Sequence, residues 1–167
     1  MRRAVVLLGV LAFLAGSCGR EPTRTSPRGG SLLPEDRLAL PEFGLAGYRA
    51  LIQELRGTPI VVNFWGSWCP PCEAEAPDLA EVSSQYRGDV QFLGVDILDE
   101  RRPARDFILR HDWQYPSVFD PTGAIRDGLG YVGQPITLIY DRRGDLAFEW
   151  NGVVTAELLR RELRKVV

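Results

Sequence analysis

The chain contains few of the residues that usually hold metals. Among its 167 residues there are three cysteines and one histidine. A zinc site requires about four ligands, and beyond the pair Cys69 and Cys72 the only further thiol is Cys18. We expect His111 to be a solvated surface residue. Covalent haem attachment requires a histidine directly after the cysteine pair, and Glu73 occupies that position. We therefore expect neither a metal nor a cofactor.

The sequence also lacks an excess of positive charge. Its 20 Lys and Arg residues and 22 Asp and Glu residues give a net charge of −2. Proteins that bind nucleic acid usually present a basic surface, so we expect no nucleic-acid partner. The hydrophobic fraction of 45% and the charged fraction of 25% are ordinary for a globular protein. A chain of 167 residues suggests one folded domain, and we expect a monomer.

The apolar run at residues 4–15 is too short to span a bilayer comfortably. It has 12 residues, whereas a transmembrane helix needs about 20. The run follows a basic start and precedes Gly16, Ser17 and Cys18, which predicts an export signal over residues 1–17. The end of this segment resembles the bacterial lipobox, in which the cysteine is lipidated and becomes the first residue of the mature chain.

We therefore expect lipidation at Cys18, although Ala15 stands where leucine is usual. Two alternatives remain, a cleaved signal with an incidental Cys18 and an uncleaved anchor. All three place the domain outside the cytoplasm. Residues 18–37 are rich in Pro, Gly, Ser, Thr and Arg, which predicts a flexible membrane tether. The folded domain is expected over residues 38–167.

The rest of the chain alternates between patterns typical of helices and of buried strands. The expected helices cover residues 48–56, 70–87, 101–111 and 155–165. The expected strands cover residues 59–65 and 90–96, and a hairpin is expected from residues 136–140 and 145–150. We expect the order β-α-β-α-β-α-β-β-α. This order predicts an α/β fold with parallel strands first and an antiparallel hairpin last.

Cys69 and Cys72 stand where the first expected strand ends and a helix begins. A structural disulfide is one interpretation, but a bridge over four residues removes little entropy from the unfolded chain. In the other, Cys69 lies at the helix N-terminus, which favours its thiolate. Cys69 is then the exposed nucleophile and Cys72 the resolving thiol. Because Pro70 and Pro71 have no N–H, we expect the N–H of Cys72 to be the nearest backbone donor.

The residues around this pair carry a family resemblance. The segment VVNFWGSWCPPCEAEAP is similar to the pattern VNFWAxWCxPCxxExPxL of the TlpA/ResA/CcmG-like thiol–disulfide oxidoreductases, a branch of the thioredoxin superfamily. The matching residues are Asn63, Phe64, Trp65, Trp68, Cys69, Pro71, Cys72, Glu75, Pro77 and Leu79. A second segment, VGQPITLIYDRRGDL, resembles the family block G-x-P-x-T-x-x-I-D-x-x-G. The resemblance implies a thioredoxin-like fold, with a central mixed β-sheet flanked by helices on both faces.

The resemblance also implies roles for residues outside the pair. It assigns a cis peptide bond to Pro135, which would lie beside the cysteines and leave the backbone of Gln134 free to pair with a substrate strand. Glu75 would take up or deliver the proton of the Cys72 thiol. The alternative for Pro135 is a proline that simply starts a strand. The alternative for Glu75 is an acid in the first helical turn that is favoured by the helix dipole. Asn63 is expected to be a structural residue satisfied inside the sheet.

The substrate surface is expected to include Trp68, Pro70 and Pro71, with packing against the helix as the alternative role of Trp68. The chain also departs from the family pattern. Residues 44–56 have a helical pattern where the family often has a β-hairpin. Ile136 stands where the CcmG branch often has Glu, which weakens an assignment to cytochrome c assembly.

Together these features predict a membrane-tethered thiol–disulfide oxidoreductase that reduces protein disulfides through a Cys69–Cys72 redox pair, with cytochrome c maturation as one client process. Its partners would be proteins with thiols or disulfides, and its electrons would come from a CcdA/DsbD-like membrane thiol donor. One alternative is a thiol peroxidase of the same superfamily, although Gly66 stands where the motif P-x-x-x-[TS]-x-x-C has Thr or Ser. Another is a non-catalytic lipoprotein whose cysteine pair is structural or sensory.

Overall fold

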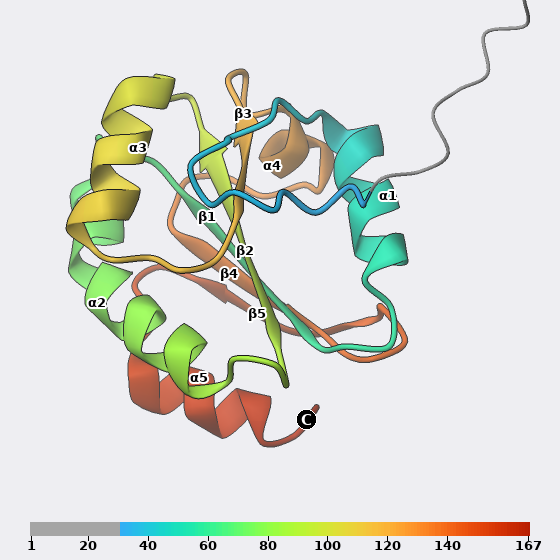
Figure 1. The fold of residues 1–167 in the computed structure, drawn as a ribbon. Helices are drawn as coiled ribbons and strands as arrows, with labels where there is room; N and C mark the ends of the chain where they lie inside the picture. Colours follow the sequence, from blue (N-terminus) through green and yellow to red (C-terminus); the bar gives the residue numbers. More distant parts are fainter. Residues whose placement is uncertain (1–30) are drawn as a thin grey trace, which may run out of the picture.

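The computed structural model describes residues 31–167, which form a mixed five-stranded sheet with helices around it (Figure 1). The strands are β1 (Ile60–Trp65), β2 (Gln91–Ile97), β3 (Ser117–Asp120), β4 (Ile136–Tyr140) and β5 (Leu146–Asn151). The helices are α1 (Leu45–Glu54), α2 (Pro70–Gln85), α3 (Arg101–Arg110), α4 (Ala124–Gly128) and α5 (Ala156–Leu163). The expected export signal, Cys18 and residues 18–30 of the expected tether lie outside the described residues.

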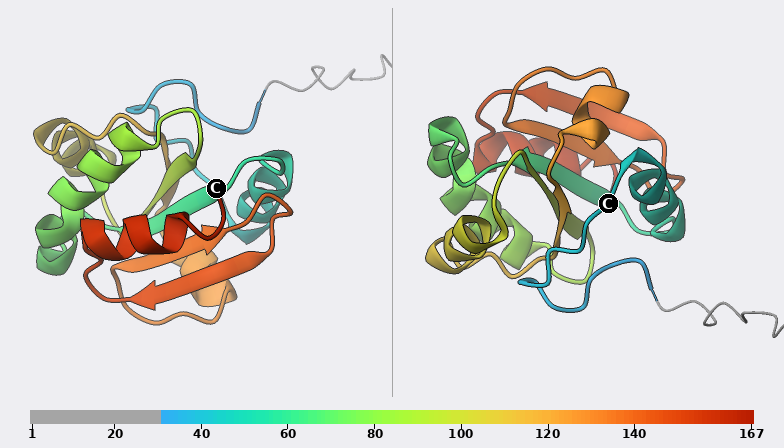
Figure 2. Two further views of the ribbon diagram at one scale, coloured as in Figure 1. Left: turned by 90° about the horizontal axis from the view of Figure 1, so that it is seen from below. Right: turned by 90° about the horizontal axis from the view of Figure 1, so that it is seen from above.

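The sheet has the strand order β3-β2-β1-β4-β5, which places β1 at its centre. β1, β2 and β3 are parallel to one another, and β4 is antiparallel to both β1 and β5. All six residues of β1 are buried, because helices cover both faces of the sheet (Figure 2). The expected fold, with parallel strands first and an antiparallel hairpin last, is confirmed.

Each face of the sheet buries its own apolar core. One core takes side chains from α2, α3 and α5, which pack against Val61 and Trp65 of β1. The other takes side chains from α1 and α4, which pack against Val62 and Phe64. Alternate residues of β1 therefore serve opposite faces, as the pleat of a strand requires. The disulfide described below belongs to the first of these cores.

The expected order of elements includes β3 and α4 but assigns no residues to them. β3 has only four residues, and its outer edge is covered by the segment that precedes α1. The N–H of Phe119 donates to the carbonyl of Pro41 at 2.8 Å, and the N–H of Phe43 donates to the carbonyl of Phe119 at 2.9 Å. α1 confirms the helix expected where the family often has a hairpin.

Residues 31–37, which fall within the expected tether, contact the folded domain. A guanidinium nitrogen of Arg37 donates to the carbonyl of Trp113 at 2.6 Å. The hydroxyl of Ser31 donates to the carboxylate of Glu54 at 2.7 Å. Residues before position 38, where the folded domain is expected to begin, therefore already make contacts with it.

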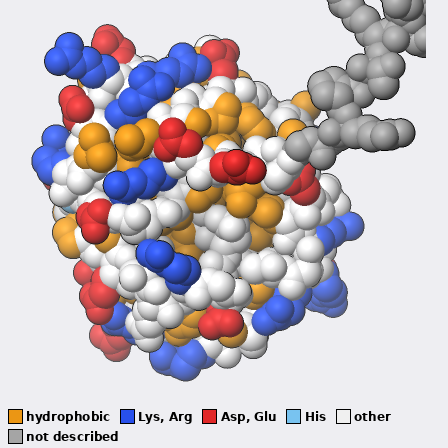
Figure 3. Space-filling view, viewed as in Figure 1, with side chains coloured by type: hydrophobic (Ala, Val, Ile, Leu, Met, Phe, Trp, Pro, Cys, Tyr) orange, Lys and Arg blue, Asp and Glu red, His pale blue; other side chains and the backbone are white. Residues whose placement is uncertain are grey.

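The surface of the described residues carries charges of both signs. Figure 3 shows Lys and Arg side chains interspersed with Asp and Glu side chains over the face seen in Figure 1. Within residues 31–167, none of the helices combines the length and the apolar character needed to cross a membrane.

Candidate active site

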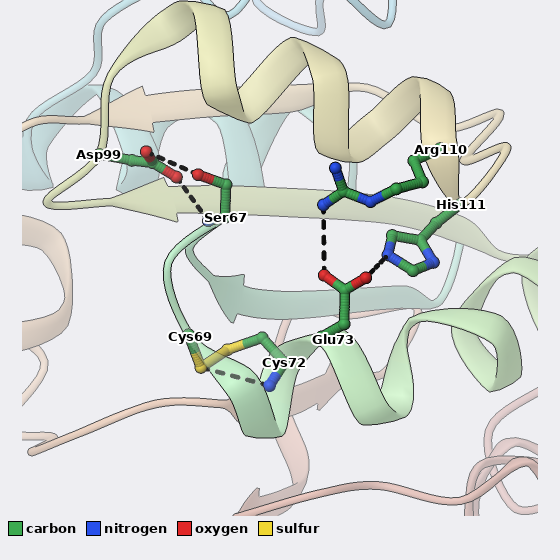
Figure 4. Close-up of polar contacts among 7 residues, drawn as sticks. All are labelled: Ser67, Cys69, Cys72, Glu73, Asp99, Arg110 and His111. Carbon is green, nitrogen blue, oxygen red and sulfur yellow. Dashed lines mark hydrogen bonds and ion pairs between the residues drawn. A yellow bond between two sulfur atoms is a disulfide. The ribbon is translucent and has the colours of Figure 1, made fainter.

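The two cysteines of the candidate active site form a disulfide at the N-terminus of α2 (Figure 4). Cys69 is the N-cap residue of the helix, and Pro70 and Pro71 are its first two residues. The N–H of Cys72 donates to the sulfur of Cys69 at 3.2 Å, which confirms the expected donor. When the disulfide is reduced, the helix dipole and this donor both favour a thiolate at Cys69.

The disulfide is more buried than the sequence suggested. Cys69 is 3% exposed and Cys72 is 1% exposed, so the prediction of an exposed Cys69 is wrong for this oxidised form. The reason is that both cysteines join the apolar core beneath α2. A groove of about 300 Å³ is lined by Ser67, Trp68, Cys69, Pro70 and Glu73. Cys72 is not among the lining residues, so this groove opens onto Cys69 alone of the two cysteines.

Asp99 holds the turn between β1 and α2. Its carboxylate accepts the backbone N–H of Ser67 and, at 2.9 Å, the hydroxyl of the same residue (Figure 4). Trp68 is 49% exposed, and its ring N–H donates to the carbonyl of Ile97 at 3.3 Å. A Cβ atom at Gly66 would lie 2.7 Å from the ring nitrogen of Trp68. Glycine at this position therefore leaves room for the indole, which is both surface-exposed and anchored.

Glu75 lies one helical turn beyond Cys72 and is 1% exposed. One carboxylate oxygen accepts from the side-chain amide of Asn63 at 2.7 Å, and the other accepts from the backbone N–H of Val154 at 2.8 Å. The amide of Asn63 also donates to the hydroxyl of Thr137 at 3.3 Å. The amide NH₂ group of Asn63 therefore links Glu75 on α2 to β1 and β4. Its side-chain carbonyl oxygen is buried and has no hydrogen-bond partner within residues 31–167, so the expectation of an Asn63 satisfied inside the sheet holds only for its NH₂ group.

The environment of Glu75 sets its acidity. Burial raises its pKa from 4.5 to about 7; the hydrogen bonds from Val154 and Asn63 oppose this effect, and the charge of Asp78 adds to it. A carboxyl group with a pKa near neutrality can both accept and release a proton at the pH where most enzymes work. Glu75 is therefore suited to proton exchange near the cysteine pair.

The peptide bond between Gln134 and Pro135 is cis, as the family resemblance implied. β4 pairs with β1 so that Ile136 stands opposite Phe64, which brings Pro135 to the end of β1 that leads to the disulfide. The side-chain carbonyl of Gln134 accepts from Arg126 at 3.2 Å. Within residues 31–167, neither the N–H nor the C=O of the Gln134 backbone has a hydrogen-bond partner. An additional strand could pair with these groups.

A polar cluster beside the disulfide was missed by the sequence analysis. The carboxylate of Glu73 is bonded by Arg110 at 3.3 Å and by the Nε2 atom of His111 at 2.9 Å (Figure 4). The side chain of His111 is only 12% exposed, because its ring lies 4.5 Å from the ring of Phe107, measured between centroids. The expectation of a solvated surface histidine is therefore wrong. The one sequence signal for this cluster was the place of Glu73 directly after Cys72.

A second buried acid, Asp96, also escaped the sequence analysis. It lies in β2 opposite Trp65 and is 0% exposed. Within the described part of the chain, neither carboxylate oxygen has a hydrogen-bond partner. Burial, together with the nearby Asp99, raises the pKa of Asp96 to about 9. Asp96 is therefore a neutral acid at pH 7.

Comparison with known proteins gives concordant similarities. The AhpC/TSA family profile matches residues 39–149. The thiol-disulfide oxidoreductase ResA of Bacillus thuringiensis subsp. konkukian is 28% identical over 123 residues, which cover 73% of this chain and 71% of that protein. The thiol:disulfide interchange protein DsbE of Pseudomonas aeruginosa is 29% identical over 170 residues, which cover 98% of this chain and 92% of that protein. A DsbE homolog of Paracoccus denitrificans is 31% identical over 155 residues, with coverages of 90% and 84%.

Solved structures show the same likeness. The structure of MTB DsbF in its mixed oxidized and reduced forms superposes with a TM-score of 0.64 at 27% identity, covering 69% of this chain and 85% of that chain. A DsbF homologue from Corynebacterium diphtheriae gives a TM-score of 0.62 at 29% identity, covering 67% and 74%. These similarities confirm the thioredoxin-like fold and the family resemblance that the sequence predicted.

Proposed function

This chain belongs to the AhpC/TSA family and is a thiol–disulfide oxidoreductase, and from this premise we propose that it reduces protein disulfides outside the cytoplasm through Cys69 and Cys72. The observation that carries the proposal is the disulfide at the N-terminus of α2, with a groove on the Cys69 side. The buried Glu75 lies one turn beyond Cys72 on the same helix. It supplies a proton site for the second half of the reaction.

The reaction begins with the reduced pair. The thiolate of Cys69 attacks one sulfur of the substrate disulfide, so that a Cys69–substrate bond forms and the substrate S–S bond breaks. The second substrate sulfur leaves as a thiolate and takes a proton from water. The helix N-terminus and the N–H of Cys72, 3.2 Å from the Cys69 sulfur, favour the attacking thiolate.

Cys72 then resolves the mixed disulfide. Its thiol gives a proton to the carboxylate of Glu75, and the resulting thiolate attacks the sulfur of Cys69. The Cys69–Cys72 disulfide forms, and the first substrate sulfur leaves as a thiolate that takes up a proton in turn. Two electrons have then moved from the pair to the substrate. Because burial raises the pKa of Glu75 to about 7, the carboxyl group can accept the Cys72 proton and release it again near neutral pH.

Apolar side chains at the disulfide end of the sheet form the surface on which we place the substrate. Nine large apolar side chains are exposed within residues 31–167. Five of them lie at this end, because they stand near or after the C-terminal ends of β1, β2 and β5 or before the start of β4: Trp68, Leu98, Val132, Trp150 and Val153. An extended substrate segment on this surface would reach the unpaired backbone of Gln134 beside Pro135. Pro70 and Pro71 are exposed there as well.

The N-terminal residues support a membrane location. Residues 1–17 have the pattern of an export signal, and Cys18 stands where a lipid would be attached. A lipid at Cys18 would hold the domain near the membrane while its active site turns. A membrane thiol donor of the CcdA/DsbD type would return the pair to its reduced form, and apocytochrome c is one client that needs free thiols.

The direction of electron flow tests this proposal. Reduction of insulin disulfides and oxidation of a reduced dithiol peptide are measured with the same protein preparation. We expect insulin reduction to be faster and to be lost in both Cys69→Ala and Cys72→Ala. Faster oxidation of the peptide would contradict the proposal. Consumption of hydrogen peroxide by a Cys72→Ser variant would instead support the thiol peroxidase alternative, and we expect none.

A further inference from the structure

Glu73 is the charged residue among the five that line the groove against Cys69. Cys69 is the N-cap residue of α2, and Glu73 follows four positions later in the first turn. The backbone N–H of Glu73 donates to the carbonyl of Cys69 at 3.1 Å, so the two residues meet across the first turn of the helix. The side chain of Glu73 is 44% exposed, so it lies at the surface of the groove rather than beneath it.

The carboxylate of Glu73 is held by the C-terminal end of α3. Arg110, in the last turn of α3, and His111, its C-cap residue, each contact one carboxylate oxygen (Figure 4). Partial burial by itself would raise the pKa of Glu73, but the hydrogen bond from Arg110 and the charge of His111 outweigh it and lower the pKa below its usual value. Glu73 therefore carries a full negative charge at neutral pH.

A negative charge at this place opposes the helix N-terminus. The helix dipole and the N–H of Cys72 favour a thiolate at Cys69, whereas a nearby carboxylate disfavours it. Pro70 and Pro71 reduce the stabilisation of the thiolate by the helix N-terminus, because neither carries an N–H that could donate to the sulfur. Two other ionisable groups that contact this region are Arg110, at the end of α3, and Asp99, which follows β2 and bonds Ser67 of the turn; the imidazole of His111 lies beside the same carboxylate of Glu73.

The structure assigns to Glu73 the role of a residue that acts through Cys69: its charge destabilises the Cys69 thiolate and so makes the cysteine pair a stronger reductant. The half-reaction explains the sign. Reduction of the disulfide takes up two electrons and one proton and gives a thiolate at Cys69 and a thiol at Cys72. Raising the free energy of that thiolate raises the free energy of the reduced form, which then gives up its electrons more readily. This inference rests on the proposed function, because it explains how a pair at a helix N-terminus can reduce rather than oxidise.

The test compares charge-neutral variants of Glu73 and Arg110 in the full-length protein. Each variant is equilibrated with glutathione buffers, and the thiolate of Cys69 is titrated by its ultraviolet absorbance. Glu73→Gln is expected to lower the pKa of Cys69 and to shift the equilibrium toward the reduced form by about three- to tenfold, which is about 14–30 mV at 29.6 mV per tenfold change. Arg110→Gln leaves Glu73 uncompensated and is expected to shift both quantities in the opposite direction.

The chain offers a matched control pair on the same helix. Glu81 on α2 is ion-paired with Arg160 of α5 and lies two turns beyond Glu73. Glu81→Gln and Arg160→Gln remove the same charges away from the disulfide, and we expect neither to change the equilibrium by as much as twofold. Because Glu73 is partly exposed, its effect is also expected to shrink in 1 M salt, where the Debye length is about 3 Å.

Opposite signs for Glu73→Gln and Arg110→Gln would support the inference. Shifts in the same direction, or shifts no larger than those of the control pair, would overturn it and leave Glu73 as a link between α2 and α3. The proposed function is judged separately, by whether the unmodified protein reduces insulin faster than it oxidises a dithiol peptide. If the unmodified protein oxidises the peptide faster but the two variants shift in opposite directions, the proposed direction of electron flow is contradicted. The effect of the Glu73 charge on Cys69 is then still supported.

Discussion

Two glutamates on α2, Glu73 and Glu75, stand two residues apart and lie in opposite environments. Glu73 is 44% exposed in its side chain and is bonded by Arg110 and His111 of α3. Glu75 is 1% exposed and is bonded by an amide of β1 and a backbone N–H after β5. The environments move the two pKa values apart: that of Glu73 is lowered, and that of Glu75 is raised to about 7.

In the proposed mechanism, this difference lets one helix turn serve both cysteines. The acid on the Cys69 side keeps its charge and can change the energy of a thiolate without exchanging protons itself. The acid on the Cys72 side has a pKa near 7 because it is buried, so it can exchange a proton with the resolving thiol. Residue type alone does not separate these roles, because the positions of the two side chains relative to the core decide them.

The pH dependence of stability provides the first test of this contrast. Between pH 4.5 and about 7 the folded protein holds a proton at Glu75 that the unfolded chain has released, so stability is lost as the pH rises through this window. Glu75→Gln removes this loss. We therefore expect the unfolding free energy of the oxidised variant, relative to that of the unmodified protein, to rise by about 3 kcal/mol between pH 4 and pH 8, at 1.36 kcal/mol per pKa unit. Urea unfolding at several pH values checks this. A difference between the two proteins that stays constant with pH would contradict the assigned pKa.

The rate of disulfide reduction provides the second test. Without a carboxylate to take the Cys72 proton, Glu75→Gln is expected to reduce insulin at least tenfold more slowly at pH 7, since general-base groups contribute about 10²–10⁴-fold. The inflection near pH 7 in the pH–rate profile is expected to disappear with it. Glu81→Gln, on the exposed part of the same helix, serves as the control and should keep the full rate. A variant with an unchanged profile would show that Glu75 is not the proton site.

The smallest expected effect is that of Glu73→Gln on the unfolding free energy. Exposed ion pairs usually contribute about 0–1 kcal/mol, so Glu73→Gln should lower the unfolding free energy by less than about 1 kcal/mol, and its stability should depend little on pH above 5. Urea unfolding beside Glu81→Gln measures this. A loss above about 2 kcal/mol would mean that Glu73 is a structural anchor and would erase the contrast with Glu75.

Much of the architecture was predictable because it depends on local patterns. The place of Cys69 at the helix N-cap and the N–H of Cys72 as its donor follow from the spacing of the cysteines and the two prolines between them. The cis bond before Pro135 came from the family resemblance. β3 could not be located, because four residues after a proline carry no usable period.

The polar partners could not be predicted, because they join residues that are far apart in the chain. Glu75 receives the N–H of Val154, 79 positions away, and a backbone donor leaves no trace in residue type. Asp99 bonds Ser67 from 32 positions away, and His111 bonds Glu73 from 38 positions away. Only the packing of α3 beside α2 brings the latter pair together. The burial of Cys69 was missed for the same reason, because it depends on the core beneath the helix.

The most direct measurement of the central claim is a trapping experiment with a disulfide-containing peptide. Reduced Cys72→Ala protein keeps the nucleophile and lacks the resolving thiol, so it should accumulate a mixed disulfide that mass spectrometry locates at Cys69. Reduced Cys69→Ala protein should form little adduct, because Cys72 does not line the groove. An adduct that forms equally in both variants, or in neither, would contradict the assignment of Cys69 as the nucleophile and Cys72 as the resolving thiol.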